Sequence, residues 1–459
     1  MSSLILQAKP EEMDTPEKRS VYTVCIVGCG QAGVLQACLF AEAGFKVICL
    51  DQDQTVVNGL AKGRPLFQRS ETEAILRAHA KASRLKATTD VKAAVPQSDI
   101  IIVTVSARVD SKDRPDYSDL EKACKHVGSN LRRGSLVMLS GVIGANTIEG
   151  SVRELLENAS GFKVGTDLGL AYSSFQERPD QTLETVANRE RIVAATDKSS
   201  LRAASLVLGT LAGKGLIKTE NVKAAEAAPM LKAVQEGAAS ALASELALFC
   251  EKKGVDYLEA CRLMDYSHVP RPTLPKLGHD EFQTETRLLL DEATSLNIRL
   301  RIPAAASEIN EEMVGHVAGL ARDALRDCGK TIRRARVTLL GISRTPNMND
   351  APNETVIELA EMLEARGAKV SLYDPHFSGE ESSEAPNRFK KNMNEALEGA
   401  DCIVVLAGHN QFRHLDLKKL KAMMKAPAAI IDCEGILEPD KIEKGGFTYR
   451  GLGRGVWKK

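Results

Sequence analysis

The regular pattern of the chain begins at Tyr22, where an apolar run, a Gly-rich turn, a helical stretch and a second apolar run follow one another. The four segments read YTVCIVG, CGQAG, VLQACLFAEAG and FKVICLD. Short apolar runs on either side of a helical stretch predict a βαβ unit. Further apolar runs, SDIIIVTVS and GSLVMLSGV, each follow a helical stretch. This alternation predicts a parallel sheet with helices on both faces over residues 21–215.

The pattern changes near Asn221, where KAAEAAPMLKAVQEGAASALASELALFCEKKG keeps apolar residues at helical spacing for about eight turns. We expect one long helix that ends at Gly254 and a second helical region over roughly 284–330. Together they predict a central helical domain over residues 216–330. The small residues of GAASALASEL favour close helix packing and a homodimer, with a helix buried inside one chain as the alternative.

From Arg336 the βαβ pattern returns in RVTLLGIS, TVIELAEMLEARG, AKVSLYDP and ADCIVVLAG. This predicts a second doubly wound domain over residues 331–459, without a GxGxxG turn after its first strand. Residues 1–20 are mostly polar and are expected to form a flexible tail. The expected fold class is therefore α/β, with two Rossmann-like doubly wound domains joined by a long central helix and a helical middle domain.

Charge and cysteine content narrow the kind of partner and compartment. Lys plus Arg and Asp plus Glu number 61 each, so no global field favours nucleic acid or an anionic membrane, and a small-molecule substrate is the expected partner. Ten cysteines without a CxxC pair indicate a reducing compartment. The N-terminal residues lack the apolar core of a signal peptide, and no apolar run of about 18 residues is present, so we expect a cytoplasmic protein without membrane attachment.

The segment GCGQAG is a GxGxxG turn placed between a predicted strand and a predicted helix. Glycines permit a tight turn and close approach of a pyrophosphate, and the helix N-terminus offers free N–H donors. An acidic residue at the end of the next strand suits a ribose 2′-hydroxyl and repels a 2′-phosphate, so NAD is favoured over NADP. A Gly-rich turn that has lost its cofactor is the alternative. The expected cofactor-binding residues are Gly28, Gly30, Gln31, Ala32, Gly33 and Asp51.

With these elements in place, the chain resembles the UDP-glucose/GDP-mannose (nucleotide-sugar) dehydrogenase family from about residue 22 to 455. The resemblance is carried by GCGQAGVLQACLFAEAGFKVICLD, AEAAPMLKAV, SEINEEM, LLGISRTPNMND and the terminal YRGLGRG. It implies two Rossmann-like domains around a central helix, a homodimer, and oxidation of a sugar-nucleotide C6 alcohol to a carboxylate with two NAD.

Several positions depart from the family pattern. The resemblance implies a Cys nucleophile that captures an aldehyde, and this position reads Asp280. The Lys and Asn of the central helix read Pro229 and Ala233, and the Thr of the turn near the nicotinamide reads Gly141.

In the last domain, the Lys and Arg of the first loop read Thr345 and Pro352, and the Arg of an Asp-Gly-Arg segment reads Glu434. Cationic groups that would neutralise phosphates are thereby lost.

Four residues are the candidate catalytic groups: Glu177, Lys232, His279 and Asp280. Glu177 lies in a Glu-Arg pair that matches the family and is a candidate acid or base, or a surface pair. Lys232 follows Pro229 by three residues, and the alternative is a solvated side chain. His279 and Asp280 form a candidate acid-base pair, a metal contact or part of a plain polar loop. Two adjacent residues without further ligands are weak evidence for a metal, so no metal site is predicted.

Two functions follow from these observations. The first is an NAD-dependent oxidoreductase acting on the CH-OH group of a UDP-sugar or related sugar, with either a two-electron oxidation or the family's four-electron oxidation as its reaction. The second is a catalytically silent NAD- or ligand-binding subunit on the same scaffold. An intact dinucleotide site fits both, whereas reduction of NAD by any substrate excludes the silent subunit.

Overall fold

The computed structural model describes residues 5–65, 70–110, 114–175, 183–264, 283–343, 345–347, 353–377 and 388–455. It divides into two compact units, Met1–Lys232 with Thr284–Ile298, and Ala233–Gln283 with Arg299–Lys459. We call them unit 1 and unit 2. The elements expected to form a separate central domain over 216–330 are thus shared between the two units.

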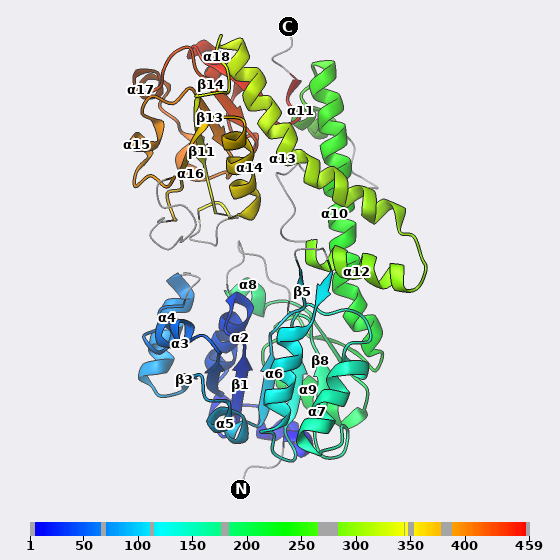
Figure 1. Ribbon diagram of the computed structural model, residues 1–459. Helices are drawn as coiled ribbons and strands as arrows, with labels where there is room; N and C mark the ends of the chain where they lie inside the picture. Colours follow the sequence, from blue (N-terminus) through cyan, green and yellow to red (C-terminus); the bar gives the residue numbers. More distant parts are fainter. Residues whose placement is uncertain are drawn as a thin grey trace. The chain divides into compact units, whose positions relative to one another are not determined.

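Unit 1 is built on an eight-stranded sheet with the order β10-β9-β8-β7-β4-β1-β2-β3 (Figure 1). Neighbouring strands pair in parallel except β8 and β9, which pair antiparallel. The strands are β1 (Thr23–Val27), β2 (Lys46–Leu50), β3 (Leu85–Thr88), β4 (Ile100–Val103), β7 (Leu136–Leu139), β8 (Gly169–Tyr172), β9 (Arg191–Ala195) and β10 (Leu216–Thr219). A short hairpin, β5 (Arg108–Val109) with β6 (Pro115–Asp116), stands apart from this sheet.

Helices cover both faces of this sheet, because the side chains of each strand alternate between two apolar cores. Val24 and Ile26 of β1 belong to one core, and Cys25 and Val27 belong to the other. The helices of unit 1 are α2 (Gln31–Glu42), α3 (Gln54–Ala61), α4 (Ser70–Lys81), α5 (Val91–Ala94), α6 (Ser118–Gly128), α7 (Arg153–Ser160), α8 (Leu183–Ala187), α9 (Lys198–Gly209) and α12 (Gln283–Ser295).

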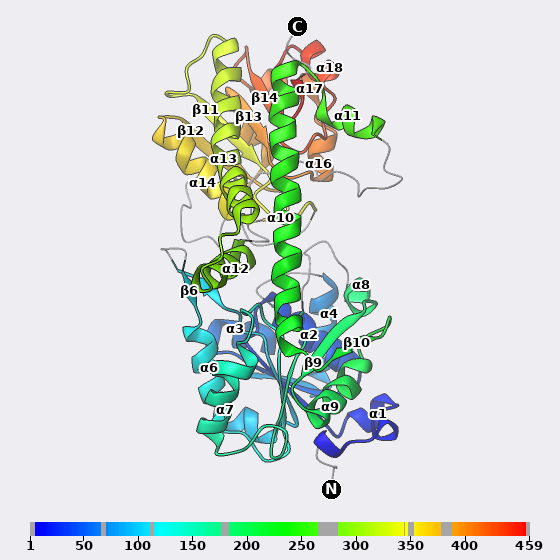
Figure 2. The same ribbon diagram turned by 90° about the vertical axis from the view of Figure 1, so that its right-hand side faces the viewer.

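Short helices before β1 occupy most of the segment expected as a flexible tail. They are η1 (Ile5–Gln7), η2 (Pro10–Glu12) and α1 (Pro16–Arg19), and η1 packs on α9. Ile5 and Leu6 are buried, and an Arg202 N–H donates to the Leu6 carbonyl at 2.6 Å. Burial of these two apolar side chains accounts for the attachment of the segment to unit 1. Figure 2 shows α1 beside α9.

The predicted long helix is α10 (Val222–Lys253), which begins in unit 1 and continues in unit 2 (Figure 2). Gly254, at φ +74°, follows its last residue. Pro229 lies inside the helix, where it has no N–H to donate to the preceding turn. The helix therefore lacks one backbone hydrogen bond near its start.

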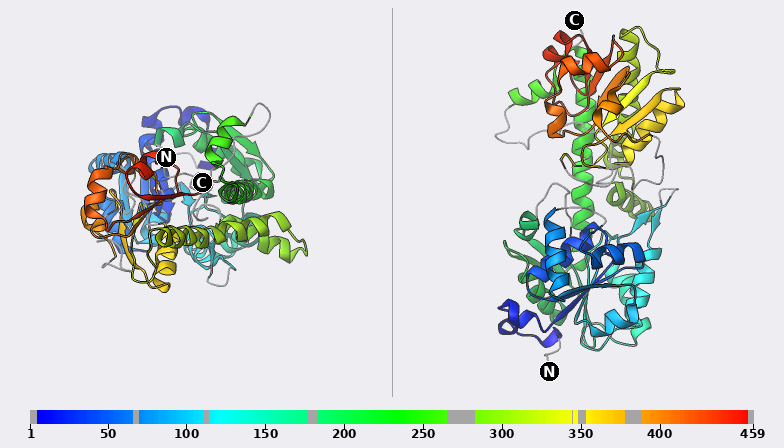
Figure 3. Two further views of the ribbon diagram at one scale, coloured as in Figure 1. Left: turned by 90° about the horizontal axis from the view of Figure 1, so that it is seen from above. Right: turned by 90° about the vertical axis from the view of Figure 1, so that its left-hand side faces the viewer.

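Unit 2 contains a five-stranded parallel sheet with the order β12-β11-β13-β14-β15. The strands are β11 (Arg336–Leu340), β12 (Lys369–Tyr373), β13 (Cys402–Val405), β14 (Ala429–Asp432) and β15 (Thr448–Gly451). The helices are α11 (Tyr257–Leu263), α13 (Arg301–Asp327), α14 (Glu354–Ala365), α15 (Met393–Leu397), α16 (Asn410–Arg413), α17 (Leu417–Met423) and α18 (Pro439–Lys444). The yellow-green α13 runs along this sheet and contacts α14 (Figure 3). The predicted α/β class with two Rossmann-like sheets is confirmed.

Within the described residues, no helix combines the length and the apolar character needed to cross a membrane.

Candidate active site

The GxGxxG turn lies where the strand order of the unit 1 sheet reverses, between β1 and β4. Ligands of open α/β sheets bind at such a point, beside the carboxyl ends of the strands. Gly28 follows β1 with φ +92°, and its N–H donates to the Leu50 carbonyl at 2.9 Å. Gly30 is the N-cap of α2, so the free N–H groups of the first helical turn face the end of β1.

The three glycines serve different purposes. A Cβ on Gly33 would lie 2.0 Å from the Gly28 carbonyl oxygen, so the packing of α2 on β1 requires glycine there. Gly28 needs glycine for its positive φ. A Cβ on Gly30, in contrast, would meet no protein atom within 4 Å, and the φ of Gly30 is an ordinary −66°. The fold itself does not require glycine at position 30. A pyrophosphate that lies close to the helix N-terminus does require it, because a side chain would occupy its space. The turn therefore fits the cofactor that the sequence predicts.

Asp51 follows β2 and stabilises the same turn. One carboxylate oxygen accepts the Cys29 N–H at 2.6 Å, and the other accepts the Asp53 N–H at 3.0 Å. The turn is also held from the other side, because the Thr104 hydroxyl, just after β4, donates to the Gly28 carbonyl at 2.5 Å. Asp51 is partly exposed at the carboxyl end of β2, the position from which an acidic residue binds a ribose.

The segment Ser140–Ile148 follows β7 at the same edge of the sheet and is held by two glutamates from distant parts of the chain. Glu226 of α10 accepts the N–H groups of Asn146 and Ile148, both at 2.7 Å. Glu292 of α12 accepts the Ala145 N–H at 2.7 Å. These three bonds fix the shape of the loop beside the dinucleotide turn.

Glycine at position 141 is needed for this shape. A Cβ on Gly141 would lie 2.6 Å from the Val105 carbonyl oxygen. The threonine that the family resemblance implies at this position therefore does not fit the loop in its present form.

Three buried or half-buried carboxyl groups gather at this edge of unit 1, and burial raises the pKa of each. The pKa of Glu226 is raised to about 7 by burial, although its two backbone N–H donors act in the opposite direction. Burial likewise raises the pKa of Glu285 and of Glu292. Glu285 differs from the other two, because among the described residues no other residue donates a hydrogen bond to it.

The positions that the resemblance assigns to Lys and Asn on α10 are apolar and buried. Pro229 and Ala233 are buried, and Met230 between them packs with Ala107 and Leu288 in a small apolar cluster. Lys232 is exposed on α10. It follows the buried Pro229 by three residues on the helix surface, yet its own side chain is open to solvent.

Three of the predicted catalytic residues, Glu177, His279 and Asp280, lie outside the described residues, as does Pro352. Their roles stay predictions. Among the residues that the structure does describe, no group of three or more His, Cys, Asp or Glu side chains is arranged to hold a metal ion.

Unit 2 repeats the arrangement of Asp51 with a more heavily bonded carboxylate. Asp374, just after β12, accepts N–H groups from Ile342 and Ser343 at 2.7 and 2.9 Å, and His409 Nε2 lies 3.1 Å from it. Nδ1 of His409 accepts the Asn347 N–H at 2.8 Å, which leaves Nε2 to carry the proton. Burial raises the pKa of Asp374, but the hydrogen bonds outweigh burial and hold this pKa well below its usual range.

The side chains of Asp374 and His409 are buried, and both bond to other groups of unit 2. They therefore order the turn after β11. Asp432 has a similar role after β14, where it accepts the N–H groups of Glu434 and Leu437 at 3.1 and 2.8 Å. Burial raises the pKa of Asp432.

Sequence reasoning missed Glu226, Glu285 and Glu292. Glu226 lies inside the segment AEAAPMLKAV, whose most evident feature is the absence of the family's Lys and Asn. Glu285, Leu288 and Glu292 recur at i, i+3 and i+7 on α12, a spacing that places them on one helix face. The sequence could therefore have indicated that Glu285 and Glu292 share one face of a helix.

Models of one family match both ends of the chain. The UDP-glucose/GDP-mannose dehydrogenase NAD-binding domain matches residues 22–208, and the UDP-binding domain of the same family matches residues 338–439. Together they span more than half of the chain.

Individual proteins agree with these matches. The chain is 27% identical over 436 residues to UDP-N-acetyl-D-mannosamine dehydrogenase from Pyrococcus horikoshii, which covers 94% of this chain and 99% of that protein. It is 25% identical over 450 residues to UDP-glucose 6-dehydrogenase from Rhizobium meliloti, again covering 94% and 99%. The solved structure of the Pyrococcus horikoshii UDP-D-ManNAc dehydrogenase matches with a TM-score of 0.85 over 95% of this chain and 100% of that chain, at 25% identity.

A UDP-glucose dehydrogenase structure from Pyrobaculum islandicum, at 21% identity and a TM-score of 0.81, covers 95% of this chain and 98% of that chain and shares the fold. The chain therefore belongs to the UDP-glucose/GDP-mannose dehydrogenase family, and unit 1 carries the NAD-binding domain of that family.

Proposed function

We propose that the protein is an NAD-dependent oxidoreductase that oxidises the CH-OH group of a UDP-sugar or a related sugar, and that it stops after one two-electron step. The supporting observation is a contrast within unit 1. The dinucleotide turn leaves free space beside Gly30. The part of α10 where the family resemblance implies a Lys is apolar instead, because Pro229 and Met230 lie there.

A bound NAD would supply the hydride acceptor for oxidation of the carbinol carbon. A base held by this chain would take the hydroxyl proton, so the products would be a carbonyl compound, NADH and one proton. This step needs an oriented hydroxyl and a proton acceptor but no covalent capture of the product. Continuation to a carboxylate by the family route requires a thiolate to hold the aldehyde, and the family resemblance of the sequence implies Asp280 at that position. A carboxylate is a poor substitute for a thiolate in that step, so the proposed product is the carbonyl compound.

The proton acceptor is proposed among Glu177, Lys232, His279 and Asp280, and the structure adds Glu285 to this set. Glu285 is 8% exposed, receives no hydrogen bond from another described residue, and lies close enough to Tyr172 to raise the pKa of that phenol. Burial raises the pKa of Glu285, which makes its carboxylate a stronger base than an exposed one. The exposed Lys232 has no comparable environment.

A catalytically silent NAD-binding subunit is the second candidate. It is favoured by the same apolar cluster around Met230, which offers no group to hold a catalytic water. Reduction of NAD by any sugar would distinguish the oxidoreductase from the silent subunit.

The ratio of NADH formed to substrate consumed tests the proposal. With limiting UDP-sugar from a panel that includes UDP-glucose, UDP-N-acetylglucosamine and UDP-N-acetylmannosamine, we expect one NADH per substrate and a carbonyl product that hydroxylamine traps. Absorbance of the reduced nicotinamide and mass spectrometry of the product measure both. Two NADH per substrate would show that Asp280 does not limit the reaction. NAD binding without reduction by any sugar, including unactivated sugars, would support the silent subunit.

The proposed assembly is a homodimer formed through α10. Leu242, Leu246 and Phe249 recur at i, i+4 and i+7 on this helix and are 58%, 44% and 58% exposed. An apolar stripe of this kind on a surface helix is typical of a protein interface. The small residues between them, Ala243, Ser244 and Ala247, are buried within the chain, so a second copy would contact the exposed Leu and Phe side chains.

Leu246→Glu is expected to convert the dimer to a monomer, because the variant places a charge inside the apolar stripe. Sedimentation velocity of the full chain measures the change. Leu263→Glu is the matched control, since Leu263 is 82% exposed on α11 and lies off this stripe. A monomeric parent protein at micromolar concentration, or a variant that still dimerises, would contradict the assembly.

A further inference from the structure

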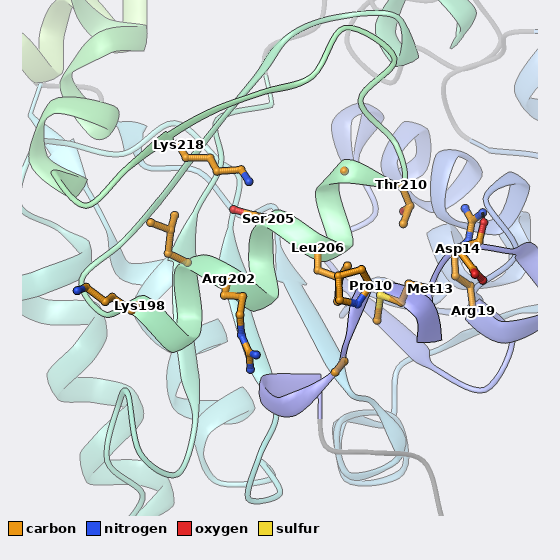
Figure 4. Close-up of a pocket in the computed structure, with 13 residues that line it drawn as sticks. Pro10, Met13, Asp14, Arg19, Lys198, Arg202, Ser205, Leu206, Thr210 and Lys218 are labelled. Atoms are coloured by element: carbon orange, nitrogen blue, oxygen red, sulfur yellow. Dashed lines mark hydrogen bonds between the residues drawn. The ribbon is translucent and has the colours of Figure 1, made fainter.

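Unit 1 contains a cavity of about 820 Å³ that lies away from the dinucleotide turn (Figure 4). Its walls come from the short helices before β1, from α9 and from the edge strand β10. None of its lining residues belongs to the GxGxxG turn, to the loop Ser140–Ile148, or to α10 and α12. A cavity of this size accommodates a ligand of ordinary metabolite size.

The lining divides into an apolar surface and a cationic surface. Met13, Leu201 and Leu206, together with Ala8 and Pro10, supply the apolar part. The charged lining residues are Arg19, Lys198, Arg202, Lys218 and Asp14. Four cations therefore face one carboxylate, and that carboxylate is already paired with Lys18 at 2.9 Å.

The cations at one end of the cavity are available to a ligand. Figure 4 places Lys198, Lys218 and Ser205 on one side of the cavity and Asp14 and Arg19 on the other. Within the described part of the chain, neither Lys198 nor Lys218 forms an ion pair or a side-chain hydrogen bond.

Ser205 provides a second sign of a binding site at this end. Its side chain is 9% exposed, and its hydroxyl has no hydrogen-bond partner. A buried hydroxyl without a partner is costly in a folded protein, and a ligand oxygen would remove that cost.

We propose that this cavity binds a small phosphate monoester with an aliphatic body. The phosphate carries close to two negative charges and several acceptor oxygens, which match the two ammonium groups and the Ser205 hydroxyl. The aliphatic body lies against Leu201, Leu206 and Met13. None of the described lining residues is aromatic, so the cavity offers no surface on which a nucleobase would stack.

Calorimetric titration of the full chain with n-hexyl phosphate, inorganic phosphate and 1-hexanol tests the proposal. We expect one saturable site for hexyl phosphate, weaker binding of inorganic phosphate, and no detectable binding of hexanol. Added NaCl is expected to weaken the binding of hexyl phosphate, because both lysines are exposed to solvent. Saturating NAD is expected to leave it unchanged.

The variant Lys198→Met/Lys218→Met is expected to lower the affinity for hexyl phosphate at least tenfold, which corresponds to about 1.4 kcal/mol. Lys81→Met/Lys214→Met removes two exposed lysines that do not line the cavity and is expected to bind as the parent does. Both variants should bind NAD normally.

Three results would overturn the proposal. They are absence of saturable binding of hexyl phosphate to the parent protein, displacement of hexyl phosphate by NAD, and equal loss of affinity in both double variants. Equal affinities for hexyl phosphate and inorganic phosphate would exclude the aliphatic part of the ligand.

Discussion

Gly30→Ala is expected to lower the affinity for NAD at least tenfold while leaving the stability of the protein within about 0.5 kcal/mol of the parent. The new methyl group meets no protein atom within 4 Å, and the backbone conformation of Gly30 suits alanine. The methyl group does occupy the space into which a pyrophosphate is drawn against the helix N-terminus. Calorimetric titration with NAD and a thermal unfolding curve measure the two effects separately.

Gly33→Ala, three residues along, is the informative comparison. Its methyl group would lie 2.0 Å from the Gly28 carbonyl oxygen, so α2 has to move away from β1. We expect loss of both NAD binding and stability, the latter by about 1–3 kcal/mol. If Gly30→Ala bound NAD as tightly as the parent, the turn would not be the pyrophosphate site. If it unfolded the protein, glycine at position 30 would serve the fold.

The second large effect is a dependence of stability on pH that arises from Glu226. Burial raises its pKa from an ordinary value of 4.5 to about 7, and its side chain has no solvent exposure. The folded state therefore binds more protons than the unfolded state between these two values. This contribution to the free energy of unfolding is fully present below about pH 4.5 and is lost as the pH rises through 7, and its full size is about 3 kcal/mol.

Glu226→Gln is expected to remove this dependence, because an amide does not titrate. Its single oxygen can accept only one of the two loop N–H groups, so the variant is also expected to be less stable than the parent at every pH. Urea unfolding of parent and variant at about pH 5 and pH 8 measures the difference, and the stability of the variant should change less. Carboxyl groups far from Glu226 titrate alike in both proteins and cancel in the comparison. Glu149 and Glu292 are coupled electrostatically to Glu226 and add a smaller difference. Parallel pH profiles for the two proteins would show that Glu226 does not hold a proton in this range.

The cofactor turn could be predicted from the sequence because all its determinants are local. Gly28, Gly30 and Gly33 lie within six residues, and Asp51 ends the next strand, so one βαβ unit fixes their geometry. Both sheets could likewise be predicted, because the spacing of apolar residues within each segment distinguishes a strand from a helix.

The loop contacts beside the turn could not be predicted in this way. Ala145 is 147 residues from Glu292, and Asn146 is 80 residues from Glu226. Such pairs depend on how α10 and α12 pack on unit 1, which no local pattern encodes. The mostly polar composition of residues 1–20 similarly concealed Ile5 and Leu6, which are buried where η1 packs on α9.

All ten cysteines of the chain are buried, and burial raises the pKa of several of their thiols, including Cys25 and Cys124, to about 12. A thiol reacts with alkylating agents and peroxides as its thiolate and only where reagent can reach it. The cysteine thiols of the folded protein are therefore shielded from such reagents. The rate at which a cysteine is alkylated therefore measures how often the core around it opens. Because both units contain cysteines, the opening of each unit can be followed separately.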